Sequence, residues 1–277
     1  MQFDLEKARA DWNRVARAWQ KWDAWLDRCY ADFNQTLINK AQIHEGDRVL
    51  DLGSGSGYPA IAIAKRVGDA GRVIGLDFSE VMLQVAETKA RSLALRNVEF
   101  RVCDITSLPL ESDSFDAAIS RFALMFVPDA AGTLQELFRV LKRGGSFALA
   151  VWGDPEKNPL PMFALKDYLD LPPVDLSVPG AYRFSERGKL KTLLEASGFA
   201  QITEEEIKVE EVFPSGREFA DHVLEMAAPL APLFEKLTPE KRETAVNRLV
   251  AEAEKYRAGS EVRVPRVALM VSGRKPA

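Results

Sequence analysis

The chain contains the segment Val49-Leu50-Asp51-Leu52-Gly53-Ser54-Gly55-Ser56-Gly57, followed by Tyr58-Pro59 and an apolar run over residues 60–64. The short apolar stretch predicts a buried strand, and the run after Pro59 predicts a helix with proline in its first turn. Alternate glycines let the backbone turn tightly and approach a ligand, because no Cβ stands in the way. A strand, a glycine turn and a helix N-terminus in this order are typical of a nucleotide-type binding crevice.

The glycine spacing separates two classes of ligand. The dinucleotide fingerprint G-x-G-x-x-G needs glycine at position 58, where this chain has Tyr58. The pattern is instead Asp51-x-Gly53-x-Gly55-x-Gly57. An acid ahead of the first glycine can pair with a cationic or amine-bearing ligand, so the spacing disfavours a pyrophosphate. A flexible Gly/Ser turn without a ligand is the alternative.

Strand-like and helical patterns alternate from residue 47 to residue 120. The predicted strands cover residues 48–52, 72–77, 98–103 and 115–120, and the predicted helices cover residues 59–67 and 80–94. This alternation predicts a parallel sheet with right-handed crossovers. Asp77 ends the second strand, where a carboxylate can accept both hydroxyls of an adenosine ribose, unless it is only a turn residue. Ser79 is a good N-cap for the next helix.

Further patterned segments follow along the chain. Residues 128–141 predict an amphipathic helix, residues 146–152 a fifth strand, residues 186–197 a helix and residues 201–213 a sixth strand. Residues 215–257 are helical by pattern, with interruptions at Pro229, Pro232 and Pro239, and residues 268–272 predict the last strand.

The glycine segment resembles the first motif of the class I S-adenosylmethionine (SAM)-dependent methyltransferases. Gly75-Leu76-Asp77-Phe78-Ser79-Glu80-Val81-Met82-Leu83 resembles the second motif of the ubiquinone and menaquinone biosynthesis C-methyltransferases, the methyltransferase type 11 group. Arg101-Val102-Cys103-Asp104-Ile105 and residues 134–145 match the same group. The resemblance covers about residues 46–152. It implies an α/β, Rossmann-like fold with a seven-stranded, mostly parallel sheet, helices on both faces, a helical N-terminus and a helical cap.

The resemblance also implies the cofactor SAM and a set of residues that bind it. Asp77 would hold the ribose, Met82 would pack on the adenine, Asp104 would meet the adenine amino group, and Ile105 would supply a backbone contact. For Met82 and Cys103, packing in the core is the alternative. The candidates are Asp51, Gly53, Ser54, Gly55, Gly57, Asp77, Phe78, Met82, Cys103, Asp104, Ile105, Ser120, Arg121 and Phe122. Cys103 is expected at the buried end of its strand.

The segments outside the motifs suggest where the methyl acceptor binds. We expect an N-terminal helical segment (1–45), a SAM-binding core (46–153), a loop or cap excursion (154–185), a core continuation (186–213), a helical cap insertion (214–260), and the last strand with a tail (261–277). Val15, Trp19, Trp22 and Leu26 share one face of a helix over residues 4–41. This stripe either docks the segment as core or walls the acceptor site as a lid.

The candidates for an acceptor pocket are Trp19, Trp25, Tyr30, Trp152 and His222. For His222, a surface position in the cap is favoured over a role as a base. We assign no catalytic residue. No His/Cys/Asp cluster has the spacing of metal ligands, so no metal is expected.

Composition excludes several classes of function. The formal net charge is -4 and the pI about 5.5, which argues against a large nucleic-acid footprint. Two cysteines imply no disulfide framework and fit a reducing cytoplasm, and no apolar run is long enough to span a membrane. Residues 120–124 also lack the Asn/Asp-Pro-Pro-aromatic motif usual in methylases of nucleobase amines.

The sequence therefore predicts methyl transfer from SAM to a small apolar or aromatic, quinol-like metabolite. O-, N- or S-methylation of another small molecule, a nicotinamide-dependent oxidoreductase and a SAM-binding protein without catalysis remain as alternatives.

Overall fold

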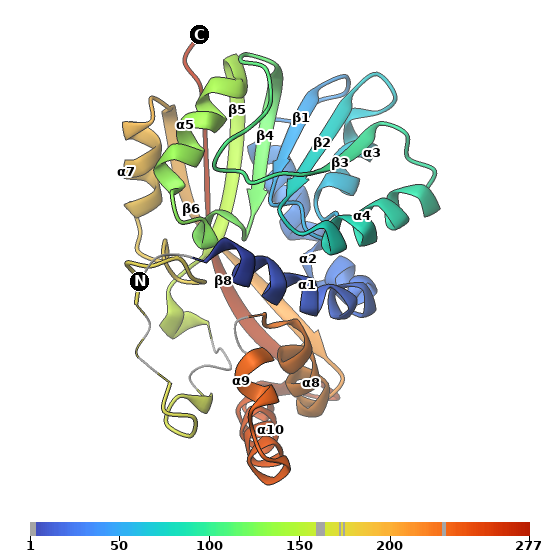
Figure 1. The fold of residues 1–277 in the computed structure, drawn as a ribbon, viewed down its shortest axis with the longest axis vertical. Coiled ribbons are helices and arrows are strands. Elements are labelled where there is room, and N and C mark those ends of the chain that lie inside the picture. Colours follow the sequence, from blue (N-terminus) through green and yellow to red (C-terminus); the bar gives the residue numbers. More distant parts are fainter. Residues whose placement is uncertain (1–3, 159–163, 172, 174, 229–230) are drawn as a thin grey trace. The chain divides into compact units, whose positions relative to one another are not determined.

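The computed structural model describes residues 4–158, 164–171, 173, 175–228 and 231–277. The chain divides into two compact units, each built from separate segments. Unit 1 comprises Met1–Tyr30, Pro155–Val174 and Lys208–Val267, and unit 2 comprises Ala31–Asp154, Asp175–Ile207 and Ala268–Ala277. Figure 1 labels the elements of both units.

Unit 2 contains the alternating strands and helices that the sequence predicts. Its strands are β1 (Arg48–Leu52), β2 (Arg72–Asp77), β3 (Val98–Val102), β4 (Phe115–Arg121) and β5 (Leu141–Trp152). Its helices are α3 (Ala60–Val67), α4 (Glu80–Ser92), α5 (Ala130–Val140) and α7 (Lys189–Ala196), with a 3-10 turn η1 (Leu124–Phe126). Helices α3 and α4 pack beside β1–β3, and α5 packs against β5 and α7 (Figure 1).

The sheet has the strand order β3-β2-β1-β4-β5-β8-β6. Strands β1 to β5 pair in parallel, and β8 (Glu261–Arg274) pairs antiparallel with β5. This mostly parallel sheet confirms the predicted fold class. The path has the seven expected strands, and the two-residue β7 (Arg257–Ala258) pairs with β8 as an eighth. Parallel strands β1 to β4 bring the first three motifs and the candidate residues 120–122 to one edge of the sheet.

The core of unit 2 explains why these segments fold as they do. Strands β1 and β4 are almost wholly buried, as their apolar runs predict for parallel strands covered on both faces. Buried Leu50, Phe115 and Phe147 from the strands pack in one cluster with Leu134 and Leu194 from the helices. The hydroxyl of Ser79 accepts the Met82 backbone N–H and caps α4, as predicted.

Unit 1 is largely helical. It contains α1 (Leu5–Lys21), the first residues of α2 (Asp23–Lys40), η2 (Pro155–Lys157), α8 (Gly216–Met226), α9 (Ala231–Glu235), α10 (Pro239–Glu254) and β7. Strands β6 (Ala200–Phe213) and β8 contribute residues to both units. The two segments expected to form the acceptor side, the N-terminus and the helical insertion, thus belong to the same unit. Val15, Trp25 and Leu26 from the N-terminal segment are buried.

Several predicted boundaries are wrong. The single N-terminal helix is interrupted at Trp22, whose indole N–H donates to Glu225 of α8 at 2.8 Å and whose ring packs on His222. Helix α5 ends at Val140 and β5 starts at Leu141, because Phe115 pairs with Leu141 across the ladder. Pro239 begins α10, as expected of proline in a first turn, whereas Pro232 lies within α9. Pro229 and residues 159–163 of the predicted excursion lie outside the described residues.

Candidate functional site

The glycine turn follows β1 at the carboxyl edge of the sheet. Gly53 and Gly55 have φ values of 72° and 51°, which L side chains rarely adopt. The backbone N–H groups of Gly53 and Ser54 both donate to the carbonyl of Leu76, at 2.8 and 2.9 Å. A Cβ on Gly53 would lie 2.2 Å from that of Ala123, so the turn also packs too closely for a side chain.

Asp51 is fully buried at the end of β1. Among the described residues, neither of its carboxylate oxygens has a hydrogen-bond partner, and the hydroxyls of Ser54 and Ser56 are buried in the same way. Burial raises the pKa of Asp51 to about 8, and the positive charge of Arg121 and the nearby backbone N–H of Ala60, which does not reach hydrogen-bond geometry, partly oppose this rise. Buried acceptors without partners are costly, so this group of atoms fits a ligand that brings hydrogen-bond donors. The amine of the methionine part of SAM is such a donor.

Asp77 ends β2 beside the glycine turn. Its two carboxylate oxygens accept the backbone N–H groups of Gly55 and Ser79, each at 2.9 Å. Burial raises the pKa of Asp77 to about 6, and these N–H groups act in the opposite direction. Phe78 is half-buried and Met82 is buried, and the Met82 methyl group lies 3.5 Å from the position of a Cβ on Gly55. The first and second motifs therefore meet.

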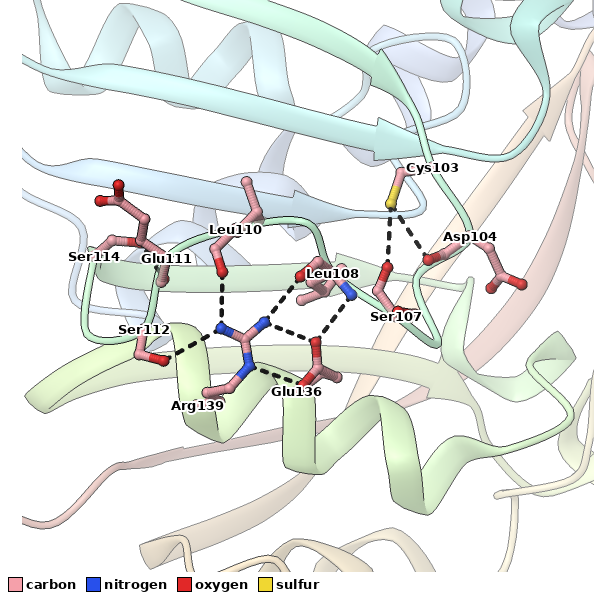
Figure 2. Close-up of polar contacts among 10 residues, drawn as sticks. All are labelled: Cys103, Asp104, Ser107, Leu108, Leu110, Glu111, Ser112, Ser114, Glu136 and Arg139. Atoms are coloured by element: carbon pink, nitrogen blue, oxygen red, sulfur yellow. Dashed lines mark hydrogen bonds and ion pairs between the residues drawn. The ribbon is translucent and has the colours of Figure 1, made fainter.

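The loop after β3 carries the third motif. Asp104 is exposed, and its Oδ1 accepts the backbone N–H and the hydroxyl of Thr106, at 3.0 and 2.8 Å. Ile105 is buried in the core. The expectation that Cys103 lies at a buried strand end is wrong, because β3 ends at Val102, which is 55% exposed. The half-buried thiol of Cys103 donates to the carbonyls of Asp104 and Ser107 (Figure 2). Burial, and then the charge of Asp104, raises the pKa of this thiol.

The end of β4 adds three further candidates. The Ser120 hydroxyl donates to the carbonyl of Leu52 at 2.8 Å and so ties β4 to β1. Arg121 donates to Oδ1 of Asn34 at 2.9 Å. Phe122 has a φ of 58° and stacks on Trp152, with 4.0 Å between the ring centroids and 10° between the planes.

Sequence reasoning missed four residues that lie near these candidates within unit 2. Phe33 and Asn34 come from α2, and Phe33 stacks on Phe122 with 5.4 Å between ring centroids. The ring of Tyr58 has the Lys89 ammonium 3.4 Å from its centroid and the Arg121 guanidinium at 5.5 Å. Local sequence patterns do not predict such contacts. For Tyr58 alone, its position directly after the glycine motif indicated that it lies near the site.

Four of the five acceptor candidates lie in unit 1, and three of them are buried together. Trp25 stacks on Phe213 at 4.8 Å and lies 4.2 Å from His222, and its indole N–H donates to the carbonyl of Val212 at 2.7 Å. The Tyr30 hydroxyl donates to Glu211 at 2.6 Å, and Glu211 also accepts Nε of Arg266 at 2.8 Å.

A surface position for His222 is wrong, because its side chain is only 7% exposed. Burial lowers its pKa to about 4, which leaves the ring neutral at neutral pH. In the described part of the chain, Nδ1 of His222 and the half-buried Trp19 indole N–H are shielded polar atoms without a hydrogen-bond partner. The fifth candidate, Trp152, lies in unit 2.

Among the described residues, no group of three or more His, Cys, Asp or Glu side chains is arranged to hold a metal ion. None of the helices in that part of the chain is long and apolar enough to cross a membrane.

Comparison with known proteins agrees with this geometry. A family model described as a methyltransferase domain matches residues 43–164. A demethylmenaquinone methyltransferase from Lactobacillus johnsonii is 33% identical over 61% of this chain and 75% of its own length. A 2-phytyl-1,4-naphthoquinone methyltransferase from a Nostoc species is 33% identical over 59% of this chain and 72% of its own length.

A solved structure has the same fold. It is phosphoethanolamine N-methyltransferase 2 of Haemonchus contortus in complex with SAM, which aligns with a TM-score of 0.56 at 20% identity over 89% of this chain and 53% of the other.

A Rossmann-like sheet with an acid-glycine turn at its carboxyl edge defines the class I methyltransferases, and SAM is the methyl donor of this class. The chain belongs to the SAM-dependent methyltransferase family and resembles its menaquinone and ubiquinone group.

Proposed function

We propose that this methyltransferase transfers the methyl group of SAM to a ring carbon of a quinol-like small molecule. The two relatives above are named for demethylmenaquinone and 2-phytyl-1,4-naphthoquinone. Both names describe naphthoquinone-type acceptors, and this shared chemistry supports the choice. O-, N- or S-methylation of another small molecule is the alternative.

The observation that carries the cofactor assignment is the buried Asp51 carboxylate without a partner in the described structure, at the end of β1. We propose that Asp51 and the glycine turn (Gly53, Ser54, Gly55 and Gly57) hold the methionine part of SAM. Asp77 holds the ribose hydroxyls; Phe78 and Met82 pack beside the adenosine, and Cys103, Asp104 and Ile105 surround its adenine. Ser120, Arg121 and Phe122 complete this site at the end of β4.

The chemistry asks little of the protein beyond placement. SAM supplies a methyl group on a sulfonium, which leaves as a neutral thioether when the new carbon–methyl bond forms. The chain has to align the two reactants and keep bulk water away. The attacking ring carbon loses a proton in the reaction, so a base near the quinol hydroxyl would help.

We further propose that Trp19, Trp25, Tyr30, Trp152 and His222 contribute to acceptor binding. The aromatic rings suit a planar ring. The neutral His222 side chain, with its buried Nδ1, could accept a proton or a hydrogen bond from a hydroxyl, and the Trp19 N–H could donate to an oxygen.

The experiment is methyl transfer from labelled SAM to a chemically reduced, prenylated 1,4-naphthoquinone. We expect a C-methylated product and release of S-adenosylhomocysteine. Parallel reactions with a phenol, an amine and a thiol test the alternative, and label in one of these products but not in the quinol would refute the acceptor assignment. Calorimetry tests the cofactor separately: S-adenosylhomocysteine should bind, and equal affinity for NAD would refute the site.

Asp77→Ala tests the ribose assignment. Hydrogen bonds to a charged group contribute about 1.5–3 kcal/mol each, so the variant should bind S-adenosylhomocysteine at least about tenfold more weakly. Asp69→Asn, an exposed carboxylate in the same unit, serves as the control and should bind normally.

A further inference from the structure

Helix α5 holds the loop between β3 and β4 through one arginine (Figure 2). All five N–H groups of the Arg139 guanidinium have an acceptor. Nε and one Nη2 hydrogen bind the two oxygens of Glu136 at 2.8 and 2.7 Å, and the other Nη2 hydrogen binds the Leu108 carbonyl at 2.9 Å. Nη1 binds the Leu110 carbonyl at 2.7 Å and the Ser112 hydroxyl at 3.3 Å. Lysine has three donors without this planar arrangement, so it could not replace these bonds.

Glu136 completes the attachment. Its Oε2 also accepts the backbone N–H of Leu108 at 2.9 Å, so both backbone polar groups of Leu108 are bound to this pair. The hydrogen bonds from Arg139 lower the pKa of Glu136, which keeps the pair ionised at neutral pH. We call Glu136 and Arg139 the α5 clamp.

The segment that the clamp holds leads directly to Asp104. On the β3 side, the Cys103 N–H donates to the carbonyl of Asp77 at 2.9 Å. Residues 104–107 form a tight turn, where the Ser107 N–H donates to the Asp104 carbonyl and Thr106 donates to the Asp104 side chain. The turn that presents Asp104 is therefore fixed at two points, Asp77 and the α5 clamp.

We propose that Glu136 and Arg139 are positioning residues that hold Asp104 in place to recognise the 6-amino group of the adenine in SAM. The inference rests on the proposed cofactor site. It adds two residues of α5, from the matched segment 134–145, which act on adenine selectivity through Leu108 without touching the cofactor.

The test compares two ligands that differ at the 6-position. S-inosylhomocysteine carries a carbonyl oxygen where S-adenosylhomocysteine has the amino group, and at this position only the amino group can donate a hydrogen bond to a carboxylate. The wild-type protein should prefer S-adenosylhomocysteine by about tenfold or more in calorimetry. Arg139→Lys should reduce this preference to below about threefold, because the Asp104 turn is no longer fixed at Leu108. A general loss of stability would lower the affinity for both ligands alike and leave the ratio of the two affinities unchanged.

Glu136→Gln is the second variant, for the case that Arg139→Lys does not fold. It retains an acceptor for Leu108 but loses the ion pair, and the preference should again fall. Lys142→Gln is the matched control. Lys142 lies in β5, directly after α5, and its ammonium group pairs with Asp116 of β4 at 2.5 Å and not with the loop between β3 and β4. An unchanged ligand ratio in a folded clamp variant would overturn the inference.

Two further outcomes separate this inference from the proposed function. If the wild-type protein binds neither ligand, the cofactor site itself is wrong. If it binds both equally, the cofactor site stands, whereas the role of Asp104 and the positioning role of the clamp are both refuted.

Discussion

Asp51 combines complete burial with a lack of hydrogen-bond partners in the described structure, and its pKa of about 8 follows from that burial. Because this pKa lies above the ordinary value of 3.8, Asp51 lowers the free energy of unfolding progressively as the pH rises from about 4 to 8. In the proposed cofactor site, the ammonium group of the ligand pairs with the ionised carboxylate. From pH 6 to pH 7.5 the ionised fraction, and with it the affinity for S-adenosylhomocysteine, should rise about twentyfold.

Calorimetry across this pH range checks the prediction, with 5′-methylthioadenosine as the comparison ligand because it lacks the amino group. Asp77 has a pKa of about 6. Its proposed partner is the ribose, which both ligands share, so its titration should cancel in their affinity ratio. The ratio should rise with pH in the wild-type protein and stay flat in Asp51→Asn. A flat ratio in the wild-type protein would show that the amine is bound elsewhere.

Gly53 and Gly144 form a natural matched pair for testing the turn. Their φ values are 72° and 75°. A Cβ on Gly53 would lie 2.2 Å from the Cβ of Ala123, whereas a Cβ on Gly144 would have no heavy atom within 4 Å. Gly144→Ala should cost only the backbone strain of about 1–2 kcal/mol. Gly53→Ala should cost about 1–3 kcal/mol more, because the added methyl group has no room. Denaturant unfolding measures both variants, and equal losses would mean that Ala123 moves aside freely.

A buried ion pair joins β6 to β8, and a tyrosine of α2 binds the same carboxylate. Glu211 accepts from Arg266 and from Tyr30, and the two charged side chains are 4% and 7% exposed. Glu211→Ala would remove the buried carboxylate that both Arg266 and the Tyr30 hydroxyl bind, and breaking a buried ion pair should lower the free energy of unfolding by about 3–5 kcal/mol.

Glu210→Ala is the matched control on the same strand. Its carboxylate pairs with Arg263 at the surface, where such pairs contribute at most about 1 kcal/mol. Thermal unfolding monitored by near-ultraviolet circular dichroism should separate the two variants clearly. Similar melting temperatures would show that Glu211 is dispensable for the packing of unit 1.

Local patterns predicted the elements that depend on local chemistry. Strands β1 and β2 begin and end at the predicted residues, because each is a buried apolar run bounded by turn residues. The interruption at Trp22 was not predictable, since the contacts of Trp22 are with Glu225 and His222, some 200 positions away. Strands β6 and β8 extend beyond the predicted limits, which were residues 201–213 and 268–272. The reason is related: the partner strands with which a strand pairs, and not the alternation of apolar and polar residues, determine where it ends.

The candidate site divides in the same way. The residues on short motifs, such as Asp51, Gly53 and Asp77, could be proposed from spacing alone. Asn34 and Arg139 could not, because each acts through partners from a different element of the fold. A polar side chain on a helix carries no sign of which loop it will bind.

For the whole molecule, the two units predict a separation of functions. Every proposed cofactor residue lies in unit 2, whereas Trp19 and Trp25 lie in unit 1. Deleting residues 1–25 should therefore change the affinity for S-adenosylhomocysteine less than about tenfold and abolish methyl transfer. Calorimetry and product analysis on the truncated protein measure the two effects. If the truncated chain does not fold, Val15 and Ala16, which are buried, belong to a core that the protein cannot lose.

The division of the chain also limits how such an enzyme can be recombined. The backbone passes between the units after residues 30, 154, 174, 207 and 267, and three of these passages fall inside α2, β6 and β8. No single crossover between two genes exchanges unit 1 as a block. A chimaera that takes unit 1, the proposed acceptor side, from another homologue has to take three separate segments and match the register of two strands and the phase of one helix at the joints. In this chain, acceptor preference should consequently diverge by point substitution more readily than by exchange of a module.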